Sequence, residues 1–412
     1  MSKIVLTSIL LLALVFGPVS AANQVVVDGV PHVKNPASPA AGTEVLELEE
    51  LWRAGGEDED VVFGLITQVL VDEANSVYLL DTQLSQVEVF SADGEHLQTL
   101  SRQGEGPGET NSPVDMLFLP DTSIGLVQAF PGKIVKIRPD GTPTGSISVG
   151  GNDPAQGGFV LLIDALQRGG NLVLSGTRIS MDQAQGTQTR TNFLSSFDMG
   201  GTEKVKYLEK AVQWDFKNLK ITEEEQHFVH FRRWTMGPDG RIYAAPHRNR
   251  YAIEVYAPEG TLERVIERAY TSLNRTEADM ARINAIADSQ KKQIPVPVDM
   301  QLCDTEPDIG RLHIADDGTL WVQTSQGNRN QPTGIITTFD VFDPAGVFVK
   351  QVQVKCPGNG EKDGVIFGRN GRMICIKGFL EAAMALQGGG GADEAGEEPE
   401  PMEVICYKAK VQ

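Results

Sequence analysis

Short stretches in which apolar and polar residues alternate recur along the whole chain. Val69–Asp72, Val77–Asp81 and Val87–Phe90 are three such stretches near the N-terminus. Asp-Gly, Asn-Gly or Gly-Gly pairs bound most of them, which is the signature of antiparallel β-hairpins. Helical spacing of apolar residues occurs in few places. The pattern therefore predicts an all-β protein.

The turn-forming pairs follow one another in a regular order. Six pairs mark a first turn, at residues 74–75, 121–122, 169–170, 239–240, 317–318 and 370–371. In the first five repeats a second pair follows roughly twenty to thirty residues later, at residues 93–94, 140–141, 200–201, 259–260 and 345–346. Two turns at this separation belong to a unit of four strands, the size of one propeller blade.

The sixth repeat is one strand short. After its first turn it offers strands at Arg372–Lys377 and Glu403–Lys410. Before the first repeat, Glu44–Trp52 alternates apolar and acidic residues. We expect this N-terminal strand to complete the last repeat, which would remove exposed strand edges. A pair of stacked sheets is the alternative architecture, but it does not explain the missing strand.

The first repeat carries the most specific motif. Its hairpins are followed by Arg102–Glu109, which reads Arg-Gln-Gly-Glu-Gly-Pro-Gly-Glu, and by Pro113. In these features the chain resembles six-bladed β-propellers of the NHL-repeat-like or TolB-like type, in which a Gly-Pro-Gly loop joins one blade to the next. The motif occurs once, whereas the hairpin pattern covers residues 44–410. The resemblance implies a six-bladed β-propeller with an N-terminal strand closing the last blade.

The first residues predict export. Lys3 precedes the apolar run Ile4–Phe16, and Val19-Ser20-Ala21 supplies the small residues that a signal peptidase requires. The apolar run is short for a helix that spans a bilayer. We expect a signal peptide, a linker and the propeller at residues 1–21, 22–43 and 44–412. The protein would then be secreted or periplasmic, without stable membrane insertion.

Three segments interrupt the repeats. The polar residues 180–192 predict a long hairpin loop. Residues 272–293 predict a helical insertion, because Met280 and Ile283 have helical spacing and Glu277 favours a first turn. Residues 387–401 are rich in glycine and acid and lack apolar side chains, so we expect a disordered loop there.

Acidic residues outnumber basic ones, and the formal net charge is -19 at pH 7. Binding to the phosphates of nucleic acids needs clustered cations, so this balance argues against a nucleic-acid partner. Anionic membrane surfaces are disfavoured for the same reason. We expect a monomer.

All four cysteines lie in the last third of the chain. An even number of cysteines in an exported protein permits disulfides. We expect Cys375 to bond to Cys406 across the closing hairpin, and Cys303 to bond to Cys356. The other pairings, and four free buried thiols, remain open.

Aligning the innermost strands on their first turns places polar residues at one level of the central channel. The aligned positions are Asp115, Arg233 and Arg311, with Gln68, Asp164 and Asp363 at or near the same level. The arginines either pair with these acids to fill the channel, or hold an anionic or sugar-like ligand. His230 and Trp234 adjoin this candidate site.

Two functions are compatible with such a channel. The favoured hypothesis is a non-enzymatic binding or scaffold module, without a cofactor, whose channel mouth or rim loops hold a protein, a peptide or a glycan. The alternative, suggested by similar propellers, is a lactonase-like hydrolase or a lyase that binds a divalent metal through Asp115, Asp164 and Asp363. Arginines at the same level would repel a cation, which favours the binding module.

Overall fold

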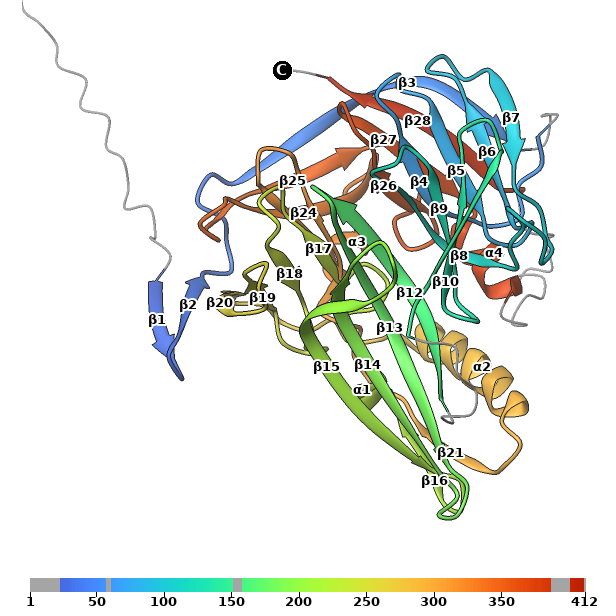
Figure 1. Cartoon of the computed structure of the whole chain (residues 1–412). Coiled ribbons are helices and arrows are strands. Elements are labelled where there is room, and N and C mark those ends of the chain that lie inside the picture. The colour runs from blue at the N-terminus through green and yellow to red at the C-terminus, as the bar shows by residue number, and fades with distance from the viewer. Residues whose placement is uncertain (1–22, 57–60, 151–157, 387–400, 411–412) are drawn as a thin grey trace, which may run out of the picture.

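The structure, a computed structural model, describes residues 23–56, 61–150, 158–386 and 401–410. It is mostly β, with many small sheets, as Figure 1 shows. The all-β class is therefore confirmed. The expected signal peptide and nearly all of the acidic segment 387–401 lie outside the described residues. Within the described part of the chain, no helix has the length and apolar character needed to cross a membrane.

In the N-terminal half the strands form three antiparallel sheets of four strands each, in chain order. The first comprises β4 (Ile66–Val71), β5 (Val77–Asp81), β6 (Gln86–Phe90) and β7 (His96–Leu100). The second comprises β8 (Pro113–Phe118), β9 (Ile124–Gln128), β10 (Lys133–Ile137) and β11 (Pro143–Ser148). The third comprises β12 (Gly158–Arg168), β13 (Asn171–Asp182), β14 (Thr187–Phe197) and β15 (Glu203–Asp215).

Three further groups of four lie within the larger sheets of the C-terminal half. One comprises β17 (Trp234–Met236), β18 (Ile242–Ala244), β19 (Ala252–Tyr256) and β20 (Leu262–Arg268). The next comprises β22 (Ile309–Ile314), β23 (Leu320–Thr324), β24 (Ile335–Phe342) and β25 (Phe348–Lys355). The last comprises β26 (Gly364–Phe367), β27 (Arg372–Lys377), β28 (Glu403–Ala409) and β3 (Thr43–Gly55).

The predicted first turns lie between the first and second strands of these groups. Asn75 and Asn370 have φ of 65° and 57°, and Gly240 and Gly318 both have φ of 82°. Asparagine and glycine tolerate this left-handed backbone better than other residues, which is why the turn pairs could be read from the sequence.

The strand β3 pairs with strands from two different groups. Its first part, Thr43–Glu47, runs parallel to β25, and its second part, Leu48–Gly55, runs antiparallel to β28. Figure 1 shows β3, in blue, beside β28, in red. A register shift opposite Cys406 and Tyr407 leaves Leu51 without a partner. This bulge turns Trp52 into the core while Leu51 remains exposed.

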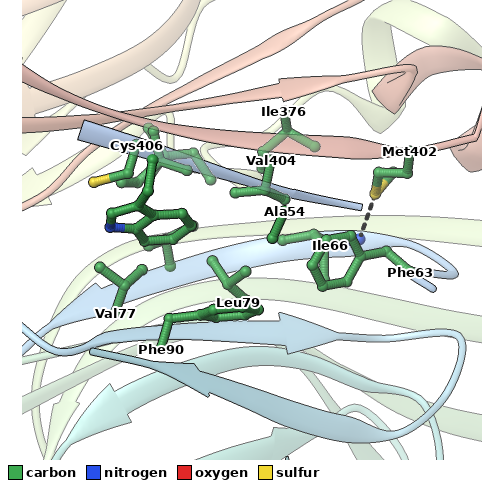
Figure 2. Close-up of a cluster of buried hydrophobic side chains, with 14 of the residues drawn as sticks. Ala54, Phe63, Ile66, Val77, Leu79, Phe90, Ile376, Met402, Val404 and Cys406 are labelled. Atoms are coloured by element: carbon green, nitrogen blue, oxygen red, sulfur yellow. Dashed lines mark hydrogen bonds between the residues drawn. The ribbon is translucent and has the colours of Figure 1, made fainter. Parts of the chain in front are cut away.

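A buried hydrophobic cluster joins the two ends of the chain. It contains Trp52 and Ala54 of β3, and residues of β4, β5, β27 and β28. Figure 2 shows Ala54, Leu79 and Val404 packed together in it. The backbone N–H of Ile66 donates to Met402 Sδ at 3.3 Å within the same cluster. The first and last groups of strands thus share one core.

Residues 22–43, expected to be a linker, include an ordered hairpin. It consists of β1 (Asn23–Val27) and β2 (Val30–Asn35). β2 extends the sheet of β17–β20 by pairing parallel to β20. Asn35 fixes this arrangement, because its side-chain amide donates to the backbone oxygens of Glu267 and Gly346 at 3.0 Å.

The polar residues 180–192 do not form a long loop. They continue β13 and β14, which pair without interruption from Leu172 opposite Phe197 to Asp182 opposite Thr187. The segment is rich in threonine, whose branched side chain suits an extended strand. The polarity of this segment therefore led to a wrong prediction of where the two strands end. Figure 1 shows these strands, in green, extending beyond the rest of the fold.

The insertion contains the expected helix. α2 spans Glu277–Gln293 and starts with a capping box between Thr276 and Asp279. β21 (Val298–Gln301), which follows the helix, pairs in parallel with β16 (Leu219–Thr222), which lies before β17 in the chain. Three shorter helices complete the described elements: α1 (Glu223–Gln226), α3 (Ser325–Asn328) and α4 (Phe379–Leu386).

A buried ion cluster anchors this insertion. The Glu223 carboxylate accepts from Arg275 at 2.7 and 2.8 Å, from Arg248 at 2.8 Å, and from the backbone N–H of Cys303 at 2.9 Å. Burial raises the pKa of Glu223, but the hydrogen bonds from Arg275, Cys303 and Arg248 outweigh it and lower the pKa to about 2. The segments around residues 223, 248, 275 and 303 are thus tied to one carboxylate.

The expected disulfides are not present, and the four cysteines are free. Cys375 lies opposite Ile405, and Cys406 lies opposite Ile374. Neighbouring residues of a strand point to opposite faces, so the two thiols enter different clusters. Cys375 instead contacts Cys356, and this contact together with burial raises the pKa of the Cys375 thiol. The prediction of a Cys375–Cys406 bond was wrong because the pairing of β27 with β28 is shifted by one residue from the one that would place the two cysteines opposite each other.

Deleting residues 23–55 should abolish cooperative unfolding. The deletion removes β3, which leaves the edges of β25 and β28 unpaired and opens the shared core. Circular dichroism during thermal unfolding checks this. Deleting residues 23–30, which removes only β1 and the start of β2, is the control and should retain a sharp transition. A sharp transition at the parent temperature in the larger deletion would contradict the expectation.

Glu223→Gln should destabilise the protein by about 2 kcal/mol at pH 7, because it removes the charge that Arg248 and Arg275 bind. A lowered carboxyl pKa gives stability that is complete above the usual value of 4.5 and is lost as the pH falls towards 2. The difference between parent and variant in urea unfolding should therefore shrink over that range. The exposed neighbour Glu225, changed to Gln, should show no such trend. A constant difference would refute the role of the charge.

Candidate functional site

The innermost strands of all six groups surround one cavity of about 570 Å³. More than half of its lining is apolar, from residues of β4, β8, β12, β17, β22 and β26 that include Val71, Phe118, Leu166, Trp234, Leu312 and Ile366. The residues nearest the first turns, such as Asp316 and Asn370, lie at one end. Arg232 and Arg311 lie nearer the other end, where the innermost strands begin. Small organic ligands bind in cavities of this size and character.

Asp115 is the centre of a hydrogen-bond network beside this cavity. Its carboxylate accepts from Arg232 Nη2 at 2.6 and 2.7 Å, from Gln68 Nε2 at 2.8 Å, and from the backbone N–H of Ala165 at 2.7 Å. Burial raises the pKa of Asp115, and the positive charge of Arg232 opposes this shift. The network joins β4, β8 and β12 to the segment that precedes β17.

Arg311 lines the same cavity but, unlike Arg232, has few partners for its side chain. Within the described residues its side chain makes one weak hydrogen bond, from Nη1 to the backbone oxygen of Val365 at 3.4 Å. No carboxylate among those residues forms an ion pair with it. Burial, followed by the charge of Arg232, lowers the pKa of Arg311 to about 10. The guanidinium therefore stays charged at neutral pH and keeps most of its donors free.

Arg233, predicted at this level, is not among the residues that line the cavity. Its Nη1 donates to the backbone oxygens of Phe228 and His230 at 3.4 and 3.1 Å. The neighbouring Arg232 takes the place in the channel instead. Phe231 and Arg232 have φ of 61° and 64°, so the strand β17 begins only at Trp234. The sequence alignment placed Arg233 in the channel because it assumed that the strand before the turn is regular back to residue 233.

The other predicted residues are distributed around the network. Trp234 is buried and lines the cavity. His230 is buried behind the cavity wall, with Nδ1 at 3.1 Å from Ser175 Oγ and Nε2 at 3.3 Å from Asn192 Oδ1. Burial, followed by the charge of Arg233, lowers the pKa of His230 to about 3, so its ring is neutral at pH 7.

The remaining acids expected in the channel have backbone partners. Asp164 accepts from the backbone N–H of Phe231 at 2.8 Å and from Ser175 Oγ at 2.9 Å. Asp363 lies in the connection before β26, where it accepts from the backbone N–H groups of Asn359 and Gly378. The three acids therefore do not converge on one point. The described residues contain no group of three His, Cys, Asp or Glu side chains placed to hold a metal ion.

The region around Asp115 carries an excess of positive charge. Three half-buried guanidiniums, of Arg232, Arg233 and Arg311, lie near two buried carboxylates, of Asp115 and Asp164. Both nearby histidines, His230 and His313, have lowered pKa values and are neutral at pH 7. This local balance is opposite in sign to that of the whole chain, and it favours an anionic group in the cavity.

Sequence reasoning missed an aromatic wall on the same cavity. The His313 ring stacks on Phe367 with centroids 4.3 Å apart, and Trp321 meets Phe367 edge to face at 5.4 Å. These residues come from three different strands, and no local signal in the sequence relates them. The position of Arg232 next to Arg233 made it a possible channel residue. The left-handed backbone that places it at the cavity could not be predicted, because phenylalanine and arginine do not favour that conformation.

Arg232→Met and Arg311→Met should have opposite effects on stability at pH 7. The first leaves the Asp115 carboxylate buried without its cation, which should cost about 3 to 5 kcal/mol. The second removes a half-buried cation that forms no ion pair within the described residues, so the melting temperature should stay equal or rise. Thermal and urea unfolding measure both. A large loss in Arg311→Met would show that Arg311 is held by the fold.

Comparison with known proteins relates the chain to others at the level of fold. No protein-family model and no curated protein sequence matches it. A solved structure of a Bacteroides fragilis protein predicted to be exported shares 11% identity and a TM-score of 0.52, over 92% of this chain and 100% of that one. A DUF4221 family member from Bacteroides vulgatus shares 11% identity and a TM-score of 0.50, over 89% and 99%. These likenesses indicate a shared fold.

Proposed function

We propose that the protein is an exported six-bladed β-propeller that binds a small organic molecule in its central channel. The observation that carries this proposal is the 570 Å³ cavity, which the innermost strands of all six groups line together. In this interpretation each group of four strands is one blade, and β3 completes the sixth blade beside β28.

Contacts between consecutive innermost strands support the ring. The backbone N–H of Leu312 in β22 donates to the backbone oxygen of Arg232 at 2.9 Å. The Ala165 N–H in β12 donates to Asp115 of β8, and Gln68 of β4 donates to the same carboxylate. Arg311 of β22 reaches the backbone oxygen of Val365 in β26. Each contact joins one group of strands to another around the cavity.

A small molecule suits this cavity better than the protein, peptide or glycan partner expected from the sequence. The volume lies within the range of small-ligand sites, and strands surround the cavity. A folded partner cannot enter such a space. Export rests on the sequence of residues 1–21, with Lys3, an apolar run and Ala21 in the order that a signal peptide requires.

The alternative of a metal-dependent hydrolase or lyase has less support. It requires the channel acids to converge, but Asp115 is bound by Arg232, and Asp363 accepts from backbone amides instead. A cation beside Arg232 and Arg311 would also meet strong repulsion. Binding without chemistry is therefore the function that the geometry favours.

Filling the channel should abolish small-molecule binding. Leu166 lines the cavity, so Leu166→Trp should occupy part of it. A panel of fragment-sized organic acids, amides and alcohols, measured by saturation-transfer NMR, should give binders for the parent protein that are lost in this variant. Leu97 is exposed on β7 and provides the matched control, Leu97→Trp. Binding that survives in Leu166→Trp, or a panel without any binder, would contradict a channel site.

A further inference from the structure

Arg311 combines three properties that suit a ligand-binding residue. It is half-buried, it lines the cavity, and among the described residues its side chain makes one weak hydrogen bond and no ion pair. A buried arginine is normally paired, because removing its charge from water is costly. The two carboxylates whose charges act on Arg311 are already bound elsewhere: Asp115 by Arg232 through two contacts, and Asp164 by Ser175 and the backbone N–H of Phe231. The charges of Asp164 and Asp115 stabilise the Arg311 guanidinium from a distance, but no carboxylate among the described residues forms an ion pair with it.

We infer that the channel binds an organic carboxylate with an apolar body, and that Arg311 holds its carboxylate group. The inference rests on the proposed function and gives its ligand a chemical class. A planar guanidinium presents paired donors that match the two oxygens of a carboxylate. The ligand would supply the anion that the described residues do not provide.

The rest of the cavity defines the other half of the ligand. From Arg311 towards the first turns, the lining includes Val71, Phe118 and Trp234, together with the ring of Phe367. Burying apolar ligand surface against such a wall is favourable. An aromatic or aliphatic body therefore belongs on this side, with its charged end at Arg311.

The charge distribution also limits the size of the anionic group. Of the two arginines that line the inner end of the cavity, Arg232 is paired with Asp115, and Arg311 forms no ion pair within the described residues. Near the other end Arg168 is paired with the exposed Asp316. The net charge of the chain is -19, which opposes the approach of highly charged ligands. A single carboxylate fits these conditions better than a polyanion.

Isothermal titration calorimetry with 3-phenylpropionate and its neutral isostere 3-phenylpropanamide tests the inference. The parent protein should bind the carboxylate at least tenfold more tightly than the amide, because a charge-assisted pair is formed in a buried site. Arg311→Met should remove this preference while leaving the affinity for the amide within about twofold. Arg311→Lys keeps the charge without the planar fork and should give an intermediate preference.

Arg138→Met is the matched control. Arg138 is exposed just after β10 and is not among the residues that line the cavity, so its loss should leave the preference for the carboxylate unchanged. Equal affinity of the parent for carboxylate and amide would overturn the ligand class while the channel site stands. The channel function itself would be overturned if neither probe bound and if the fragments bound Leu166→Trp as well as the parent protein. A melting curve for each variant confirms that it is folded during titration.

Discussion

The pairing of β3 with both β25 and β28 is the interaction on which the rest of the structure depends. Without it, the last two groups of strands would each end in an open edge, and unpaired backbone groups at an edge favour aggregation. The same strand carries Trp52 and Ala54 into the core shared by the first and last groups. A single segment far from the C-terminus in sequence therefore supplies both hydrogen bonds and apolar packing where the ends of the chain meet.

The cavity between these groups of strands makes its own demand on the polar residues. Side chains buried beside it need hydrogen-bond partners, because a buried polar group without one is costly. The Asp115 carboxylate satisfies this condition by contacting Gln68, Ala165 and Arg232 from three other parts of the chain. It acts as a polar cross-link at the level where the strands approach one another. Arg311 lies at the same level and is left with one weak hydrogen bond among the described residues.

The insertion between β20 and β22 depends on a different use of charge. Glu223 gathers Arg248 and Arg275, whose side chains are 1% and 5% exposed, so that the long excursion is fixed to the body of the fold. Both of these cations have a carboxylate partner, and the lowered pKa of Glu223 reflects that balance. Arg311 differs from both, because among the described residues it forms no ion pair and makes one weak hydrogen bond, and this supports the interpretation of the cavity as a site for an external anion.

Residues close together in the chain were enough to predict the β class, the positions of the turns and the helix α2. Asparagine and glycine tolerate a left-handed backbone in any protein, and they adopt it here at Asn75, Gly240 and Asn370. Thr276 caps α2 by accepting a hydrogen bond from the backbone of Asp279, only three residues away. The sequence did not predict which side chains share a site, because that depends on how segments far apart in the chain pack together. A left-handed backbone at Phe231 and Arg232 exchanged Arg233 for Arg232 in the channel, and a shift of one residue separated Cys375 from Cys406. Adjacent strand residues point to opposite faces, so an error of a single position in register reverses what a residue contacts.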